Sequence, residues 1–233
     1  MFPRLVQLDN EATSESQLPG STVVAGRVSA WTQSVGKRIF DLVLVVPMAI
    51  ATLPLMIAVA VAIRVSSTGP ILFRQQRCGR WGNRFELVKF RTMKHHESGG
   101  TGPNVTRKGD QRITRVGRFL RKWKLDELPQ VLNVLRGEMS LVGPRPDMPE
   151  YIAQLNASQR AIVSLHPGIT GWATLHFRDE EQLLATVPAD GLRDFYIRFV
   201  LPSKVQLDLE YGERATMWSD FVLLLKTFSS VVT

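Results

Sequence analysis

The sequence has 233 residues, enough for one domain of ordinary size, and 44% of them are hydrophobic. Lysine and arginine together number 29 against 21 acidic residues, a net charge of +8. This charge favours an anionic partner, such as nucleic acid, acidic lipid or a phosphorylated substrate. The single cysteine excludes an intramolecular disulfide framework, and the sequence lacks the CxxC and HExxH spacings of zinc sites.

The two ends of the chain carry the weakest signals. Residues 1–34 are rich in serine, threonine and glutamine without a sustained hydrophobic period, so we expect a mobile tail there. Residues 217–225 are apolar enough for a core helix or an interfacial helix, and this stretch is too short to span a membrane.

An uncharged segment near the N-terminus indicates membrane insertion. From Leu42 to Ile63 the sequence reads LVLVVPMAIATLPLMIAVAVAI, which at ~1.5 Å of rise per residue can cross a ~30 Å hydrocarbon core. Cations flank the segment on both sides, and the positive-inside tendency therefore places both ends in the cytoplasm. The flanking cations are Lys37 and Arg38 before the segment and Arg64, Arg74, Arg77, Arg80 and Arg84 after it.

Two prolines interrupt this segment, Pro47 and Pro54, and each removes a backbone donor and tends to kink a helix. A helix that enters the membrane, breaks near Pro54 and returns to the same face satisfies both the prolines and the flanking charges. A kinked single span also fits these residues. A cleaved signal peptide with the small residues 58–60 at its cleavage site is the weakest of the three interpretations.

The next 60 residues combine short strands with a basic helix. Two β-like runs, 71–73 and 85–90, are separated by glycines. The stretch 112–124 has a helical pattern, and between positions 107 and 124 the sequence holds eight cations and one anion. The apolar face of this helix would consist of Ile113, Val116, Leu120 and Trp123. Beside a membrane segment, the pattern predicts an interfacial helix against anionic headgroups, with a solvated charged face as the alternative.

Adjacent carboxylates, Asp126 and Glu127, stand where the cationic stretch gives way to a second apolar period. That period predicts a helix with Asp126 as its N-cap and Pro129 in its first turn. An ordinary cap and a reactive centre both fit this position. Free N–H groups at a helix start favour a bound phosphate, and they would keep Asp126 ionised, as a nucleophile or a metal ligand must be.

Two turns rich in proline and glycine follow, at 140–146 (SLVGPRP) and 166–172 (HPGITGW). The first holds Arg145 in a constrained loop. A rigid loop that presents one arginine suits a phosphate or carboxylate clamp, because guanidinium offers bidentate donors.

Together these motifs resemble the small monotopic phosphoglycosyl transferases, the bacterial sugar transferases that start exopolysaccharide and lipopolysaccharide assembly on polyprenol phosphate. The resemblance covers roughly residues 35 to 230, and its most specific part is the block ITRVGRFLRKWKLDELPQVLNVLRGEMSLVGPRP. The matching stretches are KRIFD (37–41), the proline at 54, QQRCG (75–79), KFRTM (89–93), the block 113–146 and PGITGWA (167–173).

The resemblance implies an α+β, mostly helical fold with a re-entrant membrane helix (35–65), interfacial amphipathic helices and a small cytoplasmic catalytic domain (66–233). It places the chain at the bacterial inner membrane, with the catalytic domain on the cytoplasmic face. The residues implied for the membrane helix are Pro54 at its break and Lys37, Arg38 and Asp41 at its anchor.

The resemblance also implies a reaction, in which sugar-1-phosphate passes from a UDP-sugar to undecaprenyl phosphate and UMP leaves, with Mg²⁺ required. Asp126 would attack the phosphorus next to the sugar and form a covalent intermediate, and Glu127 would help to hold the metal or position the acceptor. Both carboxylates are candidate metal ligands. Cations would offset the charge that moves onto UMP. The candidate substrate-binding residues are Lys89, Arg91, Arg121, Pro144 and Arg145.

The partners implied beyond the two substrates are anionic membrane lipids, a second copy of the chain as a homodimer, and downstream glycosyltransferases. Two departures limit the comparison. Many members have Ser-Pro at the membrane break where this chain has Leu53-Pro54, so Thr52 or a shifted geometry must replace the serine hydroxyl. Members also often continue PGITGWA with QVNGR, whereas this chain has TLHFR at 174–178, so the donor sugar cannot be transferred from a relative.

Three competing functions remain on the sequence alone. A membrane-tethered module that binds a polyanion or lipid without catalysis explains the charge and the anchor but leaves the block 113–146 unexplained. A metal-dependent phosphatase acting on polyprenol phosphates would share the acidic pair but release inorganic phosphate. Nucleic-acid binding is weakest, because no helix-turn-helix, zinc-finger or RNP-like pattern accompanies the basic helix, and we expect no nucleic acid among the partners.

Overall fold

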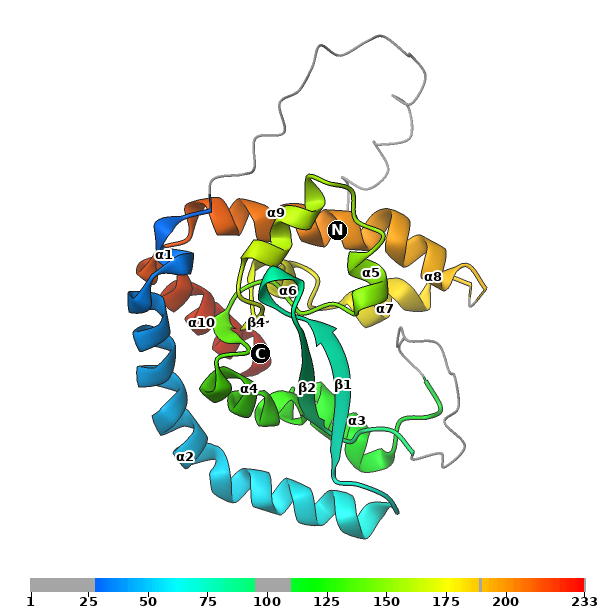
Figure 1. Ribbon diagram of the computed structural model, residues 1–233. Helices are drawn as coiled ribbons and strands as arrows, with labels where there is room; N and C mark the ends of the chain where they lie inside the picture. The colour runs from blue at the N-terminus through cyan, green and yellow to red at the C-terminus, as the bar shows by residue number, and fades with distance from the viewer. Residues whose placement is uncertain (1–27, 95–109, 189, 233) are drawn as a thin grey trace, which may run out of the picture.

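The computed structural model describes residues 28–94, 110–188 and 190–232 (Figure 1). These residues are mostly helical, with two small two-stranded sheets, as expected for a mostly helical α+β fold. Most of the predicted tail, residues 1–27, lies outside the described residues. The rest of it is packed, because α1 (Ala30–Gln33) follows Ser29, whose N–H donates to Gly212 O over 2.8 Å.

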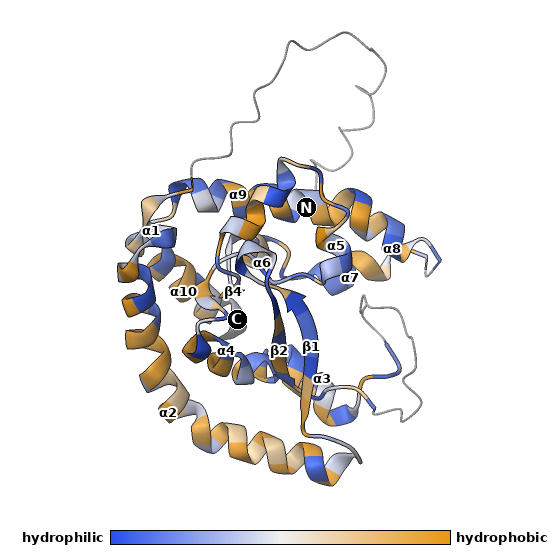
Figure 2. Ribbon diagram, in the orientation of Figure 1, coloured by the Kyte–Doolittle hydropathy of each residue, from blue (hydrophilic) through white to orange (hydrophobic). Residues whose placement is uncertain are grey.

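The long apolar helix is α2 (Val35–Ser66), which includes both prolines. Within the described part of the chain it is the one helix long and apolar enough to cross a membrane, and only 11% of its most apolar window is buried. Figure 1 shows α2 running down one side of the molecule and then turning beneath it, and Figure 2 shows apolar residues along most of its length.

One face of α2 packs on the protein along both of its halves. Val45, in the first half, belongs to a core cluster with Val131 of α4 and Leu223 of α10. Val59 and Ile63, in the second half, join a cluster that includes Leu120 of α3. The opposite face is exposed, at Val43, Val46, Ile50, Leu53, Ile57 and Val61. The helix therefore presents one side to the protein and the other to its surroundings.

The Thr52 hydroxyl bonds to the backbone of α2 just before Pro54. It donates to Met48 O over 2.8 Å. The carbonyl that Pro54 leaves without its usual donor is that of Ile50, four residues earlier. Thr52 therefore bonds to a carbonyl two residues before the freed one, and such back-bonding favours a bend in the helix.

The three residues predicted to anchor α2 each bond to a different part of the protein. Lys37 Nζ donates to Asp220 of α10 over 2.6 Å, and both side chains are buried. Arg38 donates to Val134 O and Leu135 O at the end of α4, over 2.6 and 2.9 Å. Asp41 accepts from the Leu141 N–H over 3.2 Å. Lys37 is thus an internal ion-pair partner rather than a surface cation facing headgroups.

The first sheet is an antiparallel hairpin of β1 (Leu72–Cys78) and β2 (Arg84–Phe90), close to the two predicted β-like runs. The 3₁₀ turn η1 (Arg80–Gly82) connects the strands. Leu72 pairs with Phe90 and Cys78 with Arg84, so the register is continuous from end to end. The hairpin brings Lys89 of β2 against the segment that holds the two predicted carboxylates, as β2 and η2 are in close contact.

The second sheet joins the two proline-glycine turns, which are far apart in the sequence. Strand β3 (Ser140–Val142) runs parallel to β4 (Gly168–Thr170). A Cβ on Gly143 would lie 2.2 Å from the His166 carbonyl oxygen, and one on Gly171 would lie 2.3 Å from that of Gly143. These glycines allow the two loops to touch, and the contact fixes the backbone that carries Arg145.

The basic helix α3 (Arg115–Lys122) is shorter than predicted, and Thr114 caps it by accepting from the Gly117 N–H. Of its predicted apolar face, Leu120 is buried, whereas Trp123 is 37% exposed, beyond the end of the helix. The exposed Phe119 lies on the same helix.

The next segment corrects the prediction that Asp126 caps a helix. A 3₁₀ helix, η2 (Leu125–Gln130), comes first and leads into α4 (Val131–Arg136). The cap position of η2 belongs to Lys124, in the left-handed conformation with φ 53°. Asp126 lies inside the first turn, and Pro129 lies beyond that turn. The predicted cap is wrong because Lys124 reverses the chain two residues earlier than the apolar period suggests.

The C-terminal half wraps around the second sheet as a series of short helices that end in two longer ones. Its core is a second apolar cluster, which includes Tyr151, Leu184 and Val205. The helix α10 packs Leu223 inward and exposes Trp218, so it is both a core helix and an apolar surface. The elements are α5 (Pro149–Ile152), η3 (Gln159–Ser164), α6 (Trp172–His176), α7 (Glu180–Ala185), α8 (Leu192–Phe195), the π-helical turn η4 (Tyr196–Val200), α9 (Leu201–Arg214) and α10 (Met217–Val232).

Candidate active site

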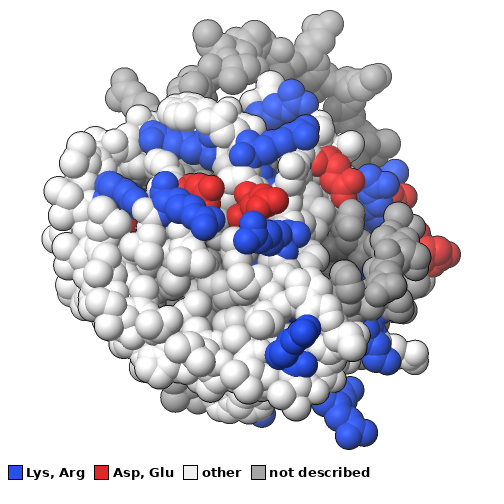
Figure 3. Space-filling view, turned by 60° about the horizontal axis from the view of Figure 1, so that its bottom comes forward, with Lys and Arg blue, Asp and Glu red and all other residues white. Residues whose placement is uncertain are grey.

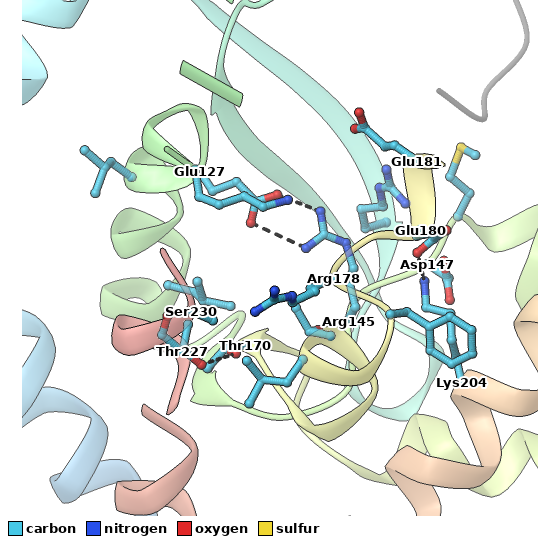
Figure 4. A pocket seen from close by; sticks show the side chains of 18 of the residues that line it. Glu127, Arg145, Asp147, Thr170, Arg178, Glu180, Glu181, Lys204, Thr227 and Ser230 are labelled. Atoms are coloured by element: carbon cyan, nitrogen blue, oxygen red, sulfur yellow. Dashed lines mark hydrogen bonds and ion pairs between the residues drawn. The ribbon is translucent and has the colours of Figure 1, made fainter. Parts of the chain in front are cut away.

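A cavity of about 350 Å³ lies where η2 and α4 face the second sheet and the C-terminal helices (Figure 4). Its wall includes Glu127 from η2 and Arg145 from the loop after β3, two of the residues predicted from the sequence. Among the described residues, nine charged side chains line the cavity, those of Arg77, Lys124, Glu127, Arg145, Asp147, Arg178, Glu180, Glu181 and Lys204.

Glu127 is held by two of the predicted substrate-binding cations. Arg145 Nη2 donates to Glu127 Oε1 over 2.6 Å, and Lys89 Nζ donates to the same oxygen over 2.9 Å. Burial alone would raise the pKa of Glu127, but Arg145 and Lys89 hold that pKa well below its ordinary value. The ion pair with Glu127 in turn raises the pKa of Arg145. We call this group of Glu127, Arg145 and Lys89 the Glu127 cluster.

Asp126, the predicted nucleophile, has a different environment from its neighbour. It is 7% exposed, and its Oδ1 is buried without a hydrogen-bond partner. Burial, reinforced by the adjacent Glu127, raises the pKa of Asp126, and Lys89 and Arg121 only partly offset this. A buried carboxylate oxygen without a donor is unfavourable unless a ligand completes it. The described residues thus leave one oxygen of Asp126 able to accept a bond from a ligand.

The other predicted substrate-binding residues lie around the cluster without joining it. Arg121 of α3 forms an ion pair with Glu181 of α7. Pro144 O accepts from the Gly168 N–H over 2.7 Å, so this residue positions the Arg145 loop through its backbone. Arg91 donates instead to Ser67, the residue that follows α2, over 2.9 Å to its carbonyl and 3.0 Å to its hydroxyl. Arg91 therefore connects the hairpin to the end of α2.

The cavity also contains polar residues that the sequence analysis did not single out. The Tyr196 hydroxyl donates to Asp147 Oδ1 over 3.3 Å, and Arg77 donates to Pro146 O over 3.2 Å. Lys204 of α9 pairs with Glu180 of α7 over 2.9 Å. Arg77 lies within the quoted QQRCG motif and Asp147 directly follows GPRP, so both were adjacent to recognised signals. Tyr196 and Lys204 carry no local signal, because only the tertiary fold brings them to the cavity.

The two carboxylates fit a divalent cation in part. The unpartnered Asp126 Oδ1 can accept a metal ligand bond, whereas each Glu127 oxygen already accepts from Arg145. Across the described ranges, no group of three or more His, Cys, Asp or Glu side chains could hold a metal. Mg²⁺ binds through one or two carboxylates together with waters and substrate phosphates. The residues present therefore suit a Mg²⁺ ion that a diphosphate substrate brings with it.

Figure 3 views the molecule with the α2 side turned forward. A broad uncharged area occupies much of this face, and lysine and arginine side chains gather in a band beside it, around acidic groups. The described surface thus places an uncharged face next to a cationic one.

Comparison with known proteins gives a consistent result. A family model described as bacterial sugar transferase matches residues 32–233. The UDP-glucose:undecaprenyl-phosphate glucose-1-phosphate transferase of Xanthomonas campestris pv. campestris is 39% identical over 201 residues, which are 83% of this chain and 38% of that protein. The undecaprenyl-phosphate glucose phosphotransferase of Komagataeibacter xylinus is 40% identical over 213 residues, 88% of this chain and 37% of that protein.

A third relative is closer to this chain in length than the first two. The UDP-glucose:undecaprenyl-phosphate glucose-1-phosphate transferase of Caulobacter vibrioides is 37% identical over 211 residues, 84% of this chain and 70% of that protein. The chain thus spans less than two-fifths of the first two relatives and most of the third. With a family model that matches nearly all of the residues after position 31 and with these relatives, the chain belongs to the bacterial sugar transferase family.

Proposed function

We propose that this chain moves a sugar-1-phosphate from a UDP-sugar to undecaprenyl phosphate and releases UMP. One observation of the structure supports this most directly: a buried oxygen of Asp126 has no partner, and the adjacent Glu127 lies in the wall of a cavity that several cations line. The names of the three relatives describe undecaprenyl-phosphate sugar phosphotransferases, two of them with UDP-glucose as donor.

In the first step Asp126 attacks the phosphorus that carries the sugar. A bond forms between a carboxylate oxygen and this phosphorus, the bond to the bridging oxygen of UMP breaks, and UMP leaves with the electron pair. In the second step an oxygen of the lipid phosphate attacks the same phosphorus and the Asp126 carboxylate leaves. The product is a lipid diphosphate sugar, the class of substrate that a downstream glycosyltransferase extends.

The cations of the cavity bind and orient the two anionic substrates. Arg145 lies on a loop that the contact between Gly143 and Gly171 fixes, so its guanidinium needs little reorganisation to receive phosphate oxygens. Lys89 donates to the same oxygen of Glu127 as Arg145 does. Asp126 and Glu127 would hold Mg²⁺, which when bound neutralises charge on the diphosphate and on the departing UMP.

The membrane arrangement forms part of the same proposal. The outward face of α2 inserts as a re-entrant helix that bends near Pro54, and both ends return to the cytoplasmic face of the bacterial inner membrane. The exposed Phe119 of α3 and Trp218 of α10 lie at the headgroup level beside anionic lipids. This geometry brings the cavity to the depth at which the phosphate of a lipid acceptor lies.

The test measures UMP released by the protein in nanodiscs that contain undecaprenyl phosphate, with Mg²⁺ and a panel of UDP-sugars that starts with UDP-glucose. We expect lipid-dependent UMP from at least one donor, and Asp126→Asn should lower the rate by at least about a thousandfold. The matched control is Asp194→Asn, at an exposed position of α8 outside the cavity, which should keep wild-type turnover.

Two outcomes would contradict the proposal. Turnover by Asp126→Asn at a rate near that of wild type would remove Asp126 as the nucleophile. Release of inorganic phosphate from the lipid without any UMP would identify a phosphatase. Trapping a phosphosugar adduct on a peptide that contains Asp126, detected by mass spectrometry with donor alone, tests the covalent intermediate separately.

A further inference from the structure

The cavity has two chemically different ends. One end lies against the apolar cluster that contains Tyr151 and Tyr196, and the other lies against the cluster that contains Val45 of α2 and Leu223 of α10. All the charged side chains of the lining come from the hairpin, η2, the loops after β3 and α6, α7 and α9. The elements α2, α4, β4, α6 and α10 contribute Met48, Val131, Ile169, Thr170, Thr174, Leu175, Thr227 and Ser230.

The uncharged end is built partly by the membrane helix itself. Met48 of α2 lines the cavity and packs on the same cluster as Val131, Ile169 and Leu175. The hydroxyls of Thr170 and Thr227 are 2.7 Å apart and connect β4 to α10 at this end. A ligand at this end therefore meets apolar side chains and hydroxyls, next to a helix whose other face is suited to lipid.

One cation, Arg178, lies between the two ends, and its ion pair among the described residues is with the next residue in the sequence and not with a carboxylate on the other side of the cavity. In Figure 4 the Arg178 side chain lies between the Glu127–Arg145 pair and the Thr170–Thr227 pair. Its ion pair within the described residues is with its sequence neighbour Asp179, at 3.4 Å from Nε, and that carboxylate is 57% exposed. The terminal nitrogens of Arg178 are thus available to an incoming anion, unlike those of Arg145.

We infer that the end of the cavity between α2 and α10 is the entry site of the prenyl phosphate acceptor, with Arg178 as the residue that receives its phosphate. An amphiphile of this kind needs an apolar wall that continues into the bilayer and a cation at the inner end of that wall. Met48, Val131 and Ile169 provide the wall, and Arg178 provides the cation. The diphosphate donor takes the charged end, where Arg77, Arg145 and Lys204 lie.

This inference rests on the proposed transfer reaction and assigns its two substrates to opposite ends of one cavity. It predicts that a change at the uncharged end raises the KM for undecaprenyl phosphate, whereas the KM for the UDP-sugar changes little. A purely structural role for these residues would lower kcat or protein yield for both substrates alike.

The first test adds bulk at the entry. Ser230→Phe places a ring in the cavity wall, and Ser229→Phe makes the same change one residue earlier, at an exposed position outside the lining. With UDP-glucose, or the donor that the UMP panel identifies, Ser230→Phe should raise the acceptor KM at least about tenfold with less than about a twofold change in donor KM. Ser229→Phe should leave both constants near wild type. An equal effect of the two variants, or a rise in donor KM alone, would overturn the assignment.

The second test addresses the cation. Arg178→Gln should raise the acceptor KM about tenfold or more, and Arg178→Lys should recover part of the loss, because a charge remains for the phosphate. A rise confined to the donor KM would assign Arg178 to the diphosphate instead and contradict the inference.

A third measurement uses the wild-type protein, so it does not depend on the folding of a variant. A benzophenone-tagged farnesyl phosphate in nanodiscs should label peptides around Met48 and Thr227, with competition by undecaprenyl phosphate and not by UDP-glucose. Labelling confined to α3, or competition by UDP-glucose, would contradict the entry site. Loss of UMP release by wild type would instead contradict the proposed function, so the two failures are distinguishable.

Discussion

Two carboxylates in this protein each attract several donors, yet they serve different purposes. Asp220 is fully buried and accepts from Lys37 over 2.6 Å, from Trp31 Nε1 over 2.8 Å and from the Tyr211 hydroxyl over 2.7 Å. Glu127 accepts from Arg145 and Lys89 with comparable distances, but its side chain is 13% exposed at a cavity wall. The number of donors therefore does not separate the two sites.

The difference lies in what surrounds each carboxylate. Both Asp220 oxygens have partners from the chain itself, and the group connects α1, α2, α9 and α10. Next to Glu127 is Asp126, with an oxygen that lacks a partner. A satisfied buried network stabilises the fold, whereas a network beside an incomplete polar group is prepared for a ligand. Two predictions test this distinction, and two more extend it to Asp208 and Thr52.

Removal of the Asp220 charge should have the largest effect. Asp220→Ala leaves Lys37 buried without its partner, so the free energy of unfolding should fall by about 3–5 kcal/mol. Chemical denaturation in nanodiscs or detergent measures this change. The control Lys37→Met/Asp220→Leu replaces both charges and should recover much of the loss. A loss below about 1 kcal/mol for Asp220→Ala would mean that the pair does not anchor α2.

Neutralising Glu127 should instead affect activity. Glu127→Gln weakens the hold on Arg145 and Lys89, and we expect kcat/KM for UMP release to fall by about a hundredfold or more. The free energy of unfolding should change less than in Asp220→Ala, because Glu127 lies at a cavity that water can enter. If Glu127→Gln unfolds as readily as Asp220→Ala while its residual activity per folded molecule stays at the wild-type value, the distinction between the two carboxylates is wrong.

A third carboxylate, that of Asp208, predicts that the stability of the fold depends on pH. Asp208 of α9 accepts from the Ala173 N–H over 3.1 Å, and burial raises the pKa of its carboxyl to about 7 from an ordinary 3.8. Between pH 3.8 and about 7 the folded state therefore binds more protons than the unfolded state. The contribution of Asp208 to the free energy of unfolding is fully present at acidic pH and declines by a few kcal/mol as the pH rises towards about 7. Above that the contribution is constant.

Denaturation series at pH 5.5, 7 and 8 check this sign. Asp208→Asn should flatten the profile, because its amide does not titrate and can still accept the same N–H. The expected decline would be absent if Asp208 stays ionised in the folded protein, and the profile of the variant would then match that of wild type.

The smallest effect is expected at the bend of α2. Thr52→Val removes the hydroxyl that donates to Met48 O and keeps the shape of the side chain. The free energy of unfolding should fall by about 0.5–1.5 kcal/mol, as for one neutral hydrogen bond. A loss of several kcal/mol would show that Thr52 replaces the family's serine as an essential partner at the break.

Local sequence patterns predicted those helices and strands that have a clear hydrophobic periodicity or turn residues at their ends. The long helix α2 follows from its run of apolar residues, and the hairpin follows from two β-like runs around glycines. The cap of η2 could not be predicted, because the apolar period says nothing of the left-handed conformation at Lys124. The order of motifs likewise indicated Glu127, Lys89 and Arg145, which the fold brings together.

Long-range pairs escaped the sequence analysis for a physical reason. Asp220 and Lys37 are 183 positions apart, and no period or spacing connects them. The same holds for Tyr196 and Asp147, and for the contact between the GPRP and HPGITGW turns, which depends on the missing side chains of Gly143 and Gly171. Lys89 and Arg91 belong to the same KFRTM motif, but the fold directs them to different partners, because Lys89 reaches Glu127 and Arg91 reaches Ser67.

The pairing of Lys37 with Asp220 also has a consequence for biosynthesis. The ribosome makes α2 well before α10, the last of the described elements, so Lys37 lacks its partner until Asp220 has been translated. Over that interval the inner face of α2 cannot pack against α10. With α2 in the membrane as proposed, its insertion would precede closure of the fold, and a nascent chain stalled before Met217 would hold an inserted helix whose Lys37 has no compensating carboxylate.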